Sequence, residues 1–229
     1  MRSRTEQLAL VQGWDDTRAT LRRWQARPLP IVGRWALASL GVATLLLAAT
    51  WVVAVLALPD PMLWTPHGGA WDAYGFILYR NGLVLALHAM ACVAGFMAGA
   101  SLPVVAEGHS GWWRRVHDHA GRIAMAFVAA ATLFSLATQA YALGLQASTV
   151  ADARGVSVAL LMVSLLPHAI PELCALFLPL AAWLLAARRR AWNELLAATF
   201  ATVAIAVPVL LIAAAVEVWV SPDLLYFLK

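Results

Sequence analysis

The sequence predicts an all-α membrane protein, a polytopic bundle of about five transmembrane helices. Hydrophobic residues make up 62% of the 229-residue chain and charged residues only 12%, against about 25% charged residues in soluble domains. Five apolar segments are each close to the roughly 20 residues that a helix needs to cross a bilayer. Eleven tryptophans suit the aromatic belts at the two membrane interfaces.

The first part of the chain, residues 1–30, is polar and basic, with hydrophobic residues recurring at near-helical spacing. This pattern predicts a basic amphipathic helix that lies on the anionic cytoplasmic leaflet. Pro28 and Pro30 are expected to end it. We interpret the remaining residues, 31–229, as a single transmembrane domain.

Five spans are expected after this segment, at Trp35–Leu58, Gly82–Val105, Ile123–Leu145, Val156–Ala187 and Leu195–Val220. The fourth would be roughly 48 Å long as a straight helix, whereas the hydrocarbon core is about 30 Å thick. Pro167 and Pro171 lie inside it, so we expect this helix to be broken near them. In the second span, Gly95 and Gly99 form a small-xxx-small face, which predicts close helix packing.

The basic residues predict the orientation of the chain. Thirteen of them lie in the N-terminal tail, the 106–122 loop and the 188–193 loop, whereas the opposite side holds only three, Arg80, Arg154 and Lys229. Cytoplasmic loops carry the excess of Lys and Arg. The sequence therefore predicts a multi-pass cell-membrane protein with a cytoplasmic N-terminus and an extracytoplasmic C-terminus. Because the basic residues form no single patch, we expect the lipid bilayer and not nucleic acid as their partner.

Ionisable residues inside the apolar segments are the candidate functional residues, because charges at membrane depth are costly and rare. His168 and Glu172 lie one helical turn apart. A rise of 1.5 Å per residue places both in the outer half of the membrane, in the same layer as Asn81, His88 and Glu217. We interpret this polar cluster as an internal latch between helices, with a ligand pocket as the alternative.

Imidazole and carboxylate groups are also metal ligands, but the chain contains no His-Glu-x-x-His motif, so no metal site is assigned. No catalytic residue and no cofactor are predicted. A nucleotide-binding loop is not visible in the sequence either, so any ATP-driven step would require a partner protein.

Three motifs resemble the stage II sporulation protein M family. The family has an Asn-Gly or Asn-Asn at the start of the second span, a His-Gly-x-x-Glu-Leu-x-Ala segment, and an Ile-Ala-Ala-x-x-Glu element followed by a proline. The similar residues here are Asn81-Gly82, then His168-Ala169-Ile170-Pro171-Glu172-Leu173-Cys174-Ala175, then Ile212-Ala213-Ala214-Ala215-Val216-Glu217 with Pro222. The resemblance covers roughly residues 78–222.

The resemblance implies a multi-pass cell-membrane protein. Sporulating members act in a membrane complex with peptidoglycan-degrading partners during engulfment, and many relatives occur in organisms that do not sporulate. We therefore expect a non-enzymatic scaffold or assembly subunit of a cell-envelope complex, with other membrane or envelope proteins as partners. The alternatives are a permease-like subunit that moves a small or lipidic solute, and a membrane-embedded metallohydrolase.

Overall fold

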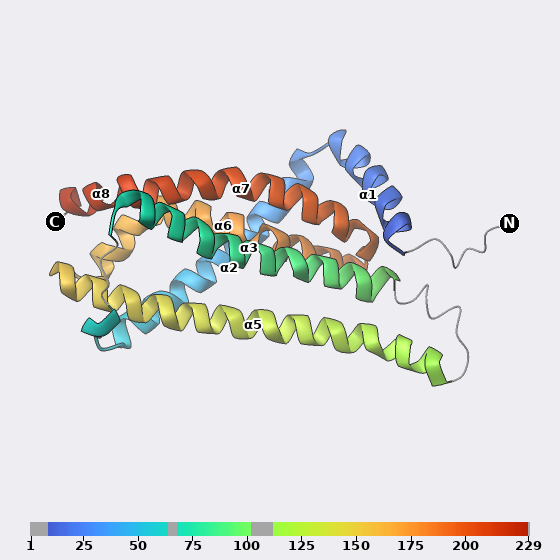
Figure 1. The fold of residues 1–229 in the computed structure, drawn as a ribbon, viewed down its shortest axis with the longest axis horizontal. Helices are drawn as coiled ribbons and strands as arrows, with labels where there is room; N and C mark the ends of the chain where they lie inside the picture. Colours follow the sequence, from blue (N-terminus) through green and yellow to red (C-terminus); the bar gives the residue numbers. More distant parts are fainter. Residues whose placement is uncertain (1–8, 64–67, 102–111, 229) are drawn as a thin grey trace. The chain divides into compact units, whose positions relative to one another are not determined.

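The computed structural model describes residues 9–63, 68–101 and 112–228. Figure 1 shows their helices, and these described residues contain no β-strand. Five of the helices are long and apolar enough to cross a membrane. The predicted class, an all-α polytopic bundle with five spans, is therefore confirmed.

The five long helices are α2 (Leu29–Leu56), α3 (Ala70–Phe96), α5 (Trp112–Arg154), α6 (Val158–Arg189) and α7 (Leu195–Trp219). Two shorter α-helices lie near the ends of the described chain, α1 (Ala9–Gln25) and α8 (Ser221–Leu228). The connecting segments contain the 3-10 turns η2 (Pro61–Leu63) and η4 (Trp192–Glu194). A π-helical turn, η3 (Met97–Ser101), continues α3.

Three of the helices, α2, α3 and α5, are longer than the apolar segments that predicted them. Helix α3 begins at Ala70, well before the expected start of the second span, and α5 has 43 residues. Hydropathy marks only the part of a helix that suits hydrocarbon, so it misses polar turns beyond that part. In α3 the early turns contain Asp72, whose negative charge suits the positive end of a helix.

The break expected near Pro167 and Pro171 is not found, and this prediction was wrong. Helix α6 is one uninterrupted α-helix of 32 residues. Each proline removes only one backbone hydrogen bond, to the carbonyl four residues earlier. Val163, Pro167 and Pro171 follow one another at intervals of four and are all exposed. The carbonyls that lose a partner therefore lie on the outer side of α6, where they interrupt no packing inside the protein.

The described chain divides into two compact units. Unit 1 comprises Met1–Ala38, Leu85–Ala131 and Leu178–Ile205, and unit 2 comprises Ser39–Val84, Thr132–Phe177 and Ala206–Lys229. Each of the five long helices contributes one segment to each unit. The prediction of an amphipathic segment at 1–30 and a single domain at 31–229 stays a prediction.

Large aromatic side chains dominate the packing of unit 1. The indole ring of Trp24 on α1 meets that of buried Trp35 on α2 edge-on, with ring centroids 5.2 Å apart. The two glycines of α3 and η3 face tryptophans, since a Cβ at Gly95 would lie 2.7 Å from Nε1 of Trp183, and one at Gly99 would overlap the ring of Trp192. Because glycine has no Cβ, Gly95 and Gly99 leave room for the indole rings of Trp183 and Trp192.

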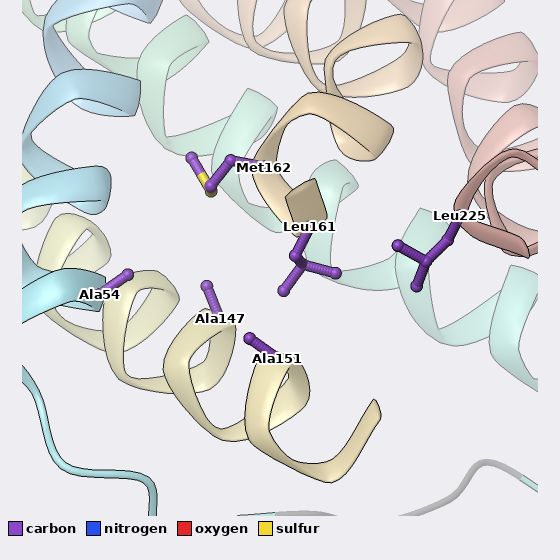
Figure 2. Close-up of a cluster of buried hydrophobic side chains, with 6 residues drawn as sticks. All are labelled: Ala54, Ala147, Ala151, Leu161, Met162 and Leu225. Atoms are coloured by element: carbon purple, nitrogen blue, oxygen red, sulfur yellow. The ribbon is translucent and has the colours of Figure 1, made fainter. Parts of the chain in front are cut away.

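Small side chains dominate the packing of unit 2. Figure 2 shows Ala54 of α2 and Ala147 and Ala151 of α5 facing the larger Leu161 and Met162 of α6, with Leu225 of α8 beside them. Hydrogen bonds add to this contact at one end of α5. The Ser148 hydroxyl donates to the carbonyl of Ala57 at 3.0 Å, and the backbone N–H of Asp60 donates to Oγ1 of Thr149 at 3.0 Å.

Candidate functional site

The candidate site is a polar cluster within unit 2. Helix α6 places His168 and Glu172 on one face, one turn apart, and α7 supplies Glu217 two residues before its end. One ligating atom from each of these three side chains lies within 4.8 Å of those of the other two. Two carboxyl groups and one imidazole ring therefore meet between two helices.

Glu172 is oriented by a third helix. The side-chain amide of Asn81 on α3 donates to Oε1 of Glu172 at 3.0 Å. Asn81 is buried, and an amide buried in an apolar setting requires such a partner. This hydrogen bond fixes one oxygen of the carboxyl group and leaves the other, Oε2, for further interactions.

His168 is oriented by the start of α8. Its Nδ1 lies 2.7 Å from Oγ of Ser221, and the Ser221 hydroxyl donates to the carbonyl of Val216 at 3.3 Å. A hydroxyl has a single proton to donate, so in this network the Ser221 oxygen accepts a hydrogen bond from the Nδ1–H group of His168. The hydrogen-bond pattern thus assigns the proton of the neutral ring to Nδ1 and a lone pair to Nε2.

The cluster is mostly withdrawn from the surface. His168 is 5% exposed, and Asn81 and Ser221 are also buried, whereas Glu172 and Glu217 are half-buried. The exposed guanidinium group of Arg80, beside Asn81 on α3, interacts electrostatically with both carboxyl groups. One permanent positive charge therefore faces two acidic groups.

An aromatic group supports the same helices. Trp71 and Tyr74 at the start of α3 pack against Trp219 at the end of α7, with ring centroids 5.1 Å and 5.3 Å from that of Trp219. The Tyr74 hydroxyl donates to the carbonyl of Leu211 at 3.3 Å. These contacts hold α3 against α7, which keeps Asn81 within reach of the acidic pair.

His88 is the predicted member that falls elsewhere. It lies two turns beyond Asn81 on α3, is buried, and belongs to unit 1. The group of three ligating side chains does not include it. The depth of all five residues in a bilayer stays a prediction, as does their role.

Two hollows in the described residues lie away from the cluster. One of about 160 Å³ in unit 1 is lined by side chains such as Trp24, Ile31 and Trp35. Another of about 150 Å³ in unit 2 is lined by Arg154, Val156, Pro222, Leu225 and Tyr226. Neither contains a residue of the polar cluster, so neither supports a solute-binding pocket there.

Ser221 is the member of this network that the sequence analysis missed. It precedes Pro222 and Asp223, and Ser-Pro-Asp is typical of a helix start, with a hydroxyl followed by proline and an acid. It also lies one turn after Glu217. Together, the helix-start pattern and the one-turn spacing indicate that the Ser221 hydroxyl lies in the same layer as Glu217.

One comparison with known proteins identifies the region that carries the cluster. Residues 120–222 match the family model described as stage II sporulation protein M. The predicted resemblance is thereby confirmed over these residues, which include the second and third motifs but not Asn81-Gly82. The comparisons with curated proteins and with solved structures gave no match.

Proposed function

We propose that this multi-pass membrane protein, whose residues 120–222 belong to the stage II sporulation protein M family, is a non-enzymatic assembly subunit of a cell-envelope complex. In this proposal α5 binds a transmembrane helix of another envelope protein. The polar cluster acts as a latch that holds α3, α6, α7 and α8 in a fixed arrangement behind it.

The observation that carries the proposal is a mismatch in α5. In each of the five described spans we consider one apolar stretch of 18 residues. In α5 only 6% of this stretch is buried, against 28% to 56% in the other four spans. A helix surrounded by lipid is expected to be strongly apolar. Yet the mean hydropathy of this stretch is also lowest in α5, at 1.5 against 1.9 to 2.5 in the other spans. A protein partner that covers α5 would account for both values.

The side chains of α5 suit such a partner. Thr138 donates its hydroxyl proton within its own helix, toward the carbonyls of Phe134 and Ser135, and the Gln139 amide donates to Oγ of Ser135 at 3.0 Å. These internal bonds allow α5 to enter the bilayer before it meets a partner. Small and polar residues are the types through which membrane helices associate.

The experiment places a photoreactive phenylalanine analogue at Phe134, which is 72% exposed on α5. The matched control places it at Leu45, which is 73% exposed on the more apolar α2. After irradiation of intact cells, we expect position 134 to yield one defined adduct and position 45 to yield none. Sequencing of the crosslinked peptide should find it within a membrane span of another protein.

Two outcomes would contradict the proposal. Equal crosslinking yields at positions 134 and 45 would mean that α5 has no more contact with a partner protein than α2 has. An adduct only with a second copy of this chain would show a homo-oligomer in place of a complex with another protein.

The orientation is part of the proposal, with the N-terminus in the cytoplasm. The thirteen-to-three distribution of basic residues supports it. A membrane-impermeant maleimide should label an Asp223→Cys variant on intact cells, and an Ala191→Cys variant only after lysis. The unsubstituted chain, in which Cys92 is buried and Cys174 half-buried, measures the background. The reverse labelling pattern would overturn the orientation.

A further inference from the structure

We infer that His168, Glu172 and Glu217 together bind one divalent transition-metal ion, for which zinc is the reference. The three side chains come from α6 and α7, and their ligating atoms lie within 4.8 Å of one another. One imidazole nitrogen and two carboxylate oxygens are a donor set that such ions accept. This inference does not depend on the proposed assembly role.

The distances fit a site that closes on its ion. Metal–ligand bonds of about 2.1 Å in a tetrahedron put the donor atoms about 3.4 Å apart. The longest separation here is no more than 4.8 Å, so the donors have to approach by at most about 1.4 Å. Rotation about the side-chain torsions of the two glutamates supplies such a movement without a shift of either helix.

The charges also favour a cation. Two ionised carboxyl groups at this distance repel each other strongly when they are withdrawn from water. The guanidinium group of Arg80 compensates one of the two charges, but it is exposed and lies over the ring of Phe76, with Cζ 6.0 Å from the centroid. A divalent ion between the carboxylates would attract both at short range.

The surrounding hydrogen bonds leave the required donor atoms available. A metal-bound histidine usually donates its other ring N–H to a fixed acceptor, and Ser221 is that acceptor for Nδ1 of His168. The lone pair on Nε2 is then available to the ion. For Glu172 the direction is reversed, since the Asn81 amide donates to Oε1, and Oε2 is then the oxygen available to the ion. Asn81 and Ser221 are therefore positioning residues, supplied by α3 and α8.

Three protein ligands define the chemical class of the site. Zinc sites with three protein ligands keep a fourth position, which water or an exogenous oxygen ligand fills. The ion would connect α6 to α7 directly, whereas the hydrogen bonds of the cluster connect α6 to α3 and to α8. The site is thus a mononuclear one with an open coordination position.

The experiment uses the full-length protein in detergent, treated with a chelator and freed of it by gel filtration. We expect titration with zinc alone to load one ion per chain, measured by elemental analysis after a second gel filtration. Cobalt in place of zinc should give visible absorption bands of a four- or five-coordinate ion. Binding of less than a fifth of an ion per chain, with no such bands, would overturn the inference.

Variants locate the site. His168→Ala, Glu172→Gln and Glu217→Gln should each abolish stoichiometric loading, and Asn81→Ala should weaken zinc affinity about 10–100-fold as a positioning change. The control variant, Glu194→Gln, makes the same chemical change on η4, outside the cluster. It should bind zinc as the unsubstituted protein does. Loading that survives in the Glu172→Gln/Glu217→Gln double variant would refute the assignment.

Folding is monitored in the same samples by circular dichroism and by elution as a single species. If His168→Ala does not fold, the two isosteric glutamine variants and the cobalt spectrum of the unsubstituted chain still decide the question. Metal loading of the isolated protein and crosslinking at Phe134 are separate measurements, so failure of one leaves the other interpretable.

Discussion

Helices α5 and α6 are neighbours in the chain, and both are long enough to cross a membrane, but they are packed in opposite ways. In α6, 56% of the 18-residue apolar stretch is buried, whereas in α5 only 6% of it is buried. Helix α6 carries His168 and Glu172 and the larger side chains of the unit 2 core. Helix α5 contributes small residues to that core and exposes Phe127, Phe134 and Tyr141.

The difference shows that burial and hydropathy have to be considered together. Helix α6 tolerates a histidine and a glutamate because neighbouring helices provide their hydrogen-bond partners. The buried residues of the described part of α5 are all small or short. Ala140, Gly144, Ala147, Ser148 and Ala151 recur at helical spacing, and Thr149 lies next to them in the chain. Helix α5 therefore attaches through one narrow face, and the remainder is available to lipid or to a partner.

The largest expected effect is on the free energy of unfolding, when phenylalanine is replaced by alanine on α6 and, for comparison, on α5. Phe177 on α6 is 0% exposed and Phe134 on α5 is 72% exposed. Phe177→Ala should lower the free energy of unfolding by about 3–5 kcal/mol, through lost packing and a cavity. Phe134→Ala should change it by less than about 0.5 kcal/mol. Unfolding by detergent titration in mixed micelles measures both, and equal losses would end the contrast between the helices.

A smaller effect is expected where α5 does make close contact. A Cβ at Gly144 would lie 2.9 Å from the backbone oxygen of Thr50 on α2, and backbone cannot move aside easily. Gly144→Ala should therefore cost about 1–3 kcal/mol of unfolding free energy. Gly75→Ala on α3 is the matched control, because a Cβ there meets nothing within 4 Å. A gain in stability at both positions would show that α5 is not anchored at Gly144.

The hydrogen bond between Asn81 and Glu172 should contribute less than this packing. Asn81→Ala removes the amide that donates to Glu172, and hydrogen bonds between membrane helices contribute about 1 kcal/mol or less. The expected loss is of that size, in the same mixed-micelle titration of metal-free protein. Asn81→Asp, which places a third acid beside two others, should cost more than Asn81→Ala. The reverse order would argue against two nearby ionised carboxyl groups.

The smallest effect on the isolated protein is expected from Thr138→Val on the exposed part of α5. Its hydroxyl bonds only within its own helix, so the unfolding free energy should change by less than about 0.5 kcal/mol. The same variant should nevertheless lower the crosslinking yield from position 134 in cells, since threonine hydroxyls are used between membrane helices. An unchanged yield would remove Thr138 from the proposed partner surface.

Much of the fold could be predicted from the sequence because the bilayer sets helix length. The five spans are found near their expected positions. The extra turns of α5 were missed because they are polar, and those of α3 because Asp72, Arg80 and Asn81 interrupt an otherwise apolar run. The break at Pro167 and Pro171 was wrong because a proline pattern does not show which side of a helix is exposed. Tertiary packing decides that, and a single sequence does not contain it.

The candidate site was predictable to the extent that it depends on position along helices. A fixed rise per residue is enough to place His168, Glu172 and Glu217 in one layer. The same count placed His88 in that layer; in the structure it belongs to unit 1, and the common depth of the five residues stays a prediction. Ser221 was missed because α8 had no apolar segment of spanning length.

Helix α8 has a practical consequence for anyone who handles this protein. Its first residue, Ser221, holds the ring of His168, and its Leu225 packs beside Leu161. A chain cut before Ser221 would lose both contacts while retaining all five spans. A purification tag or fluorescent fusion joined directly to the end of α8 therefore acts on the helix that orients this histidine.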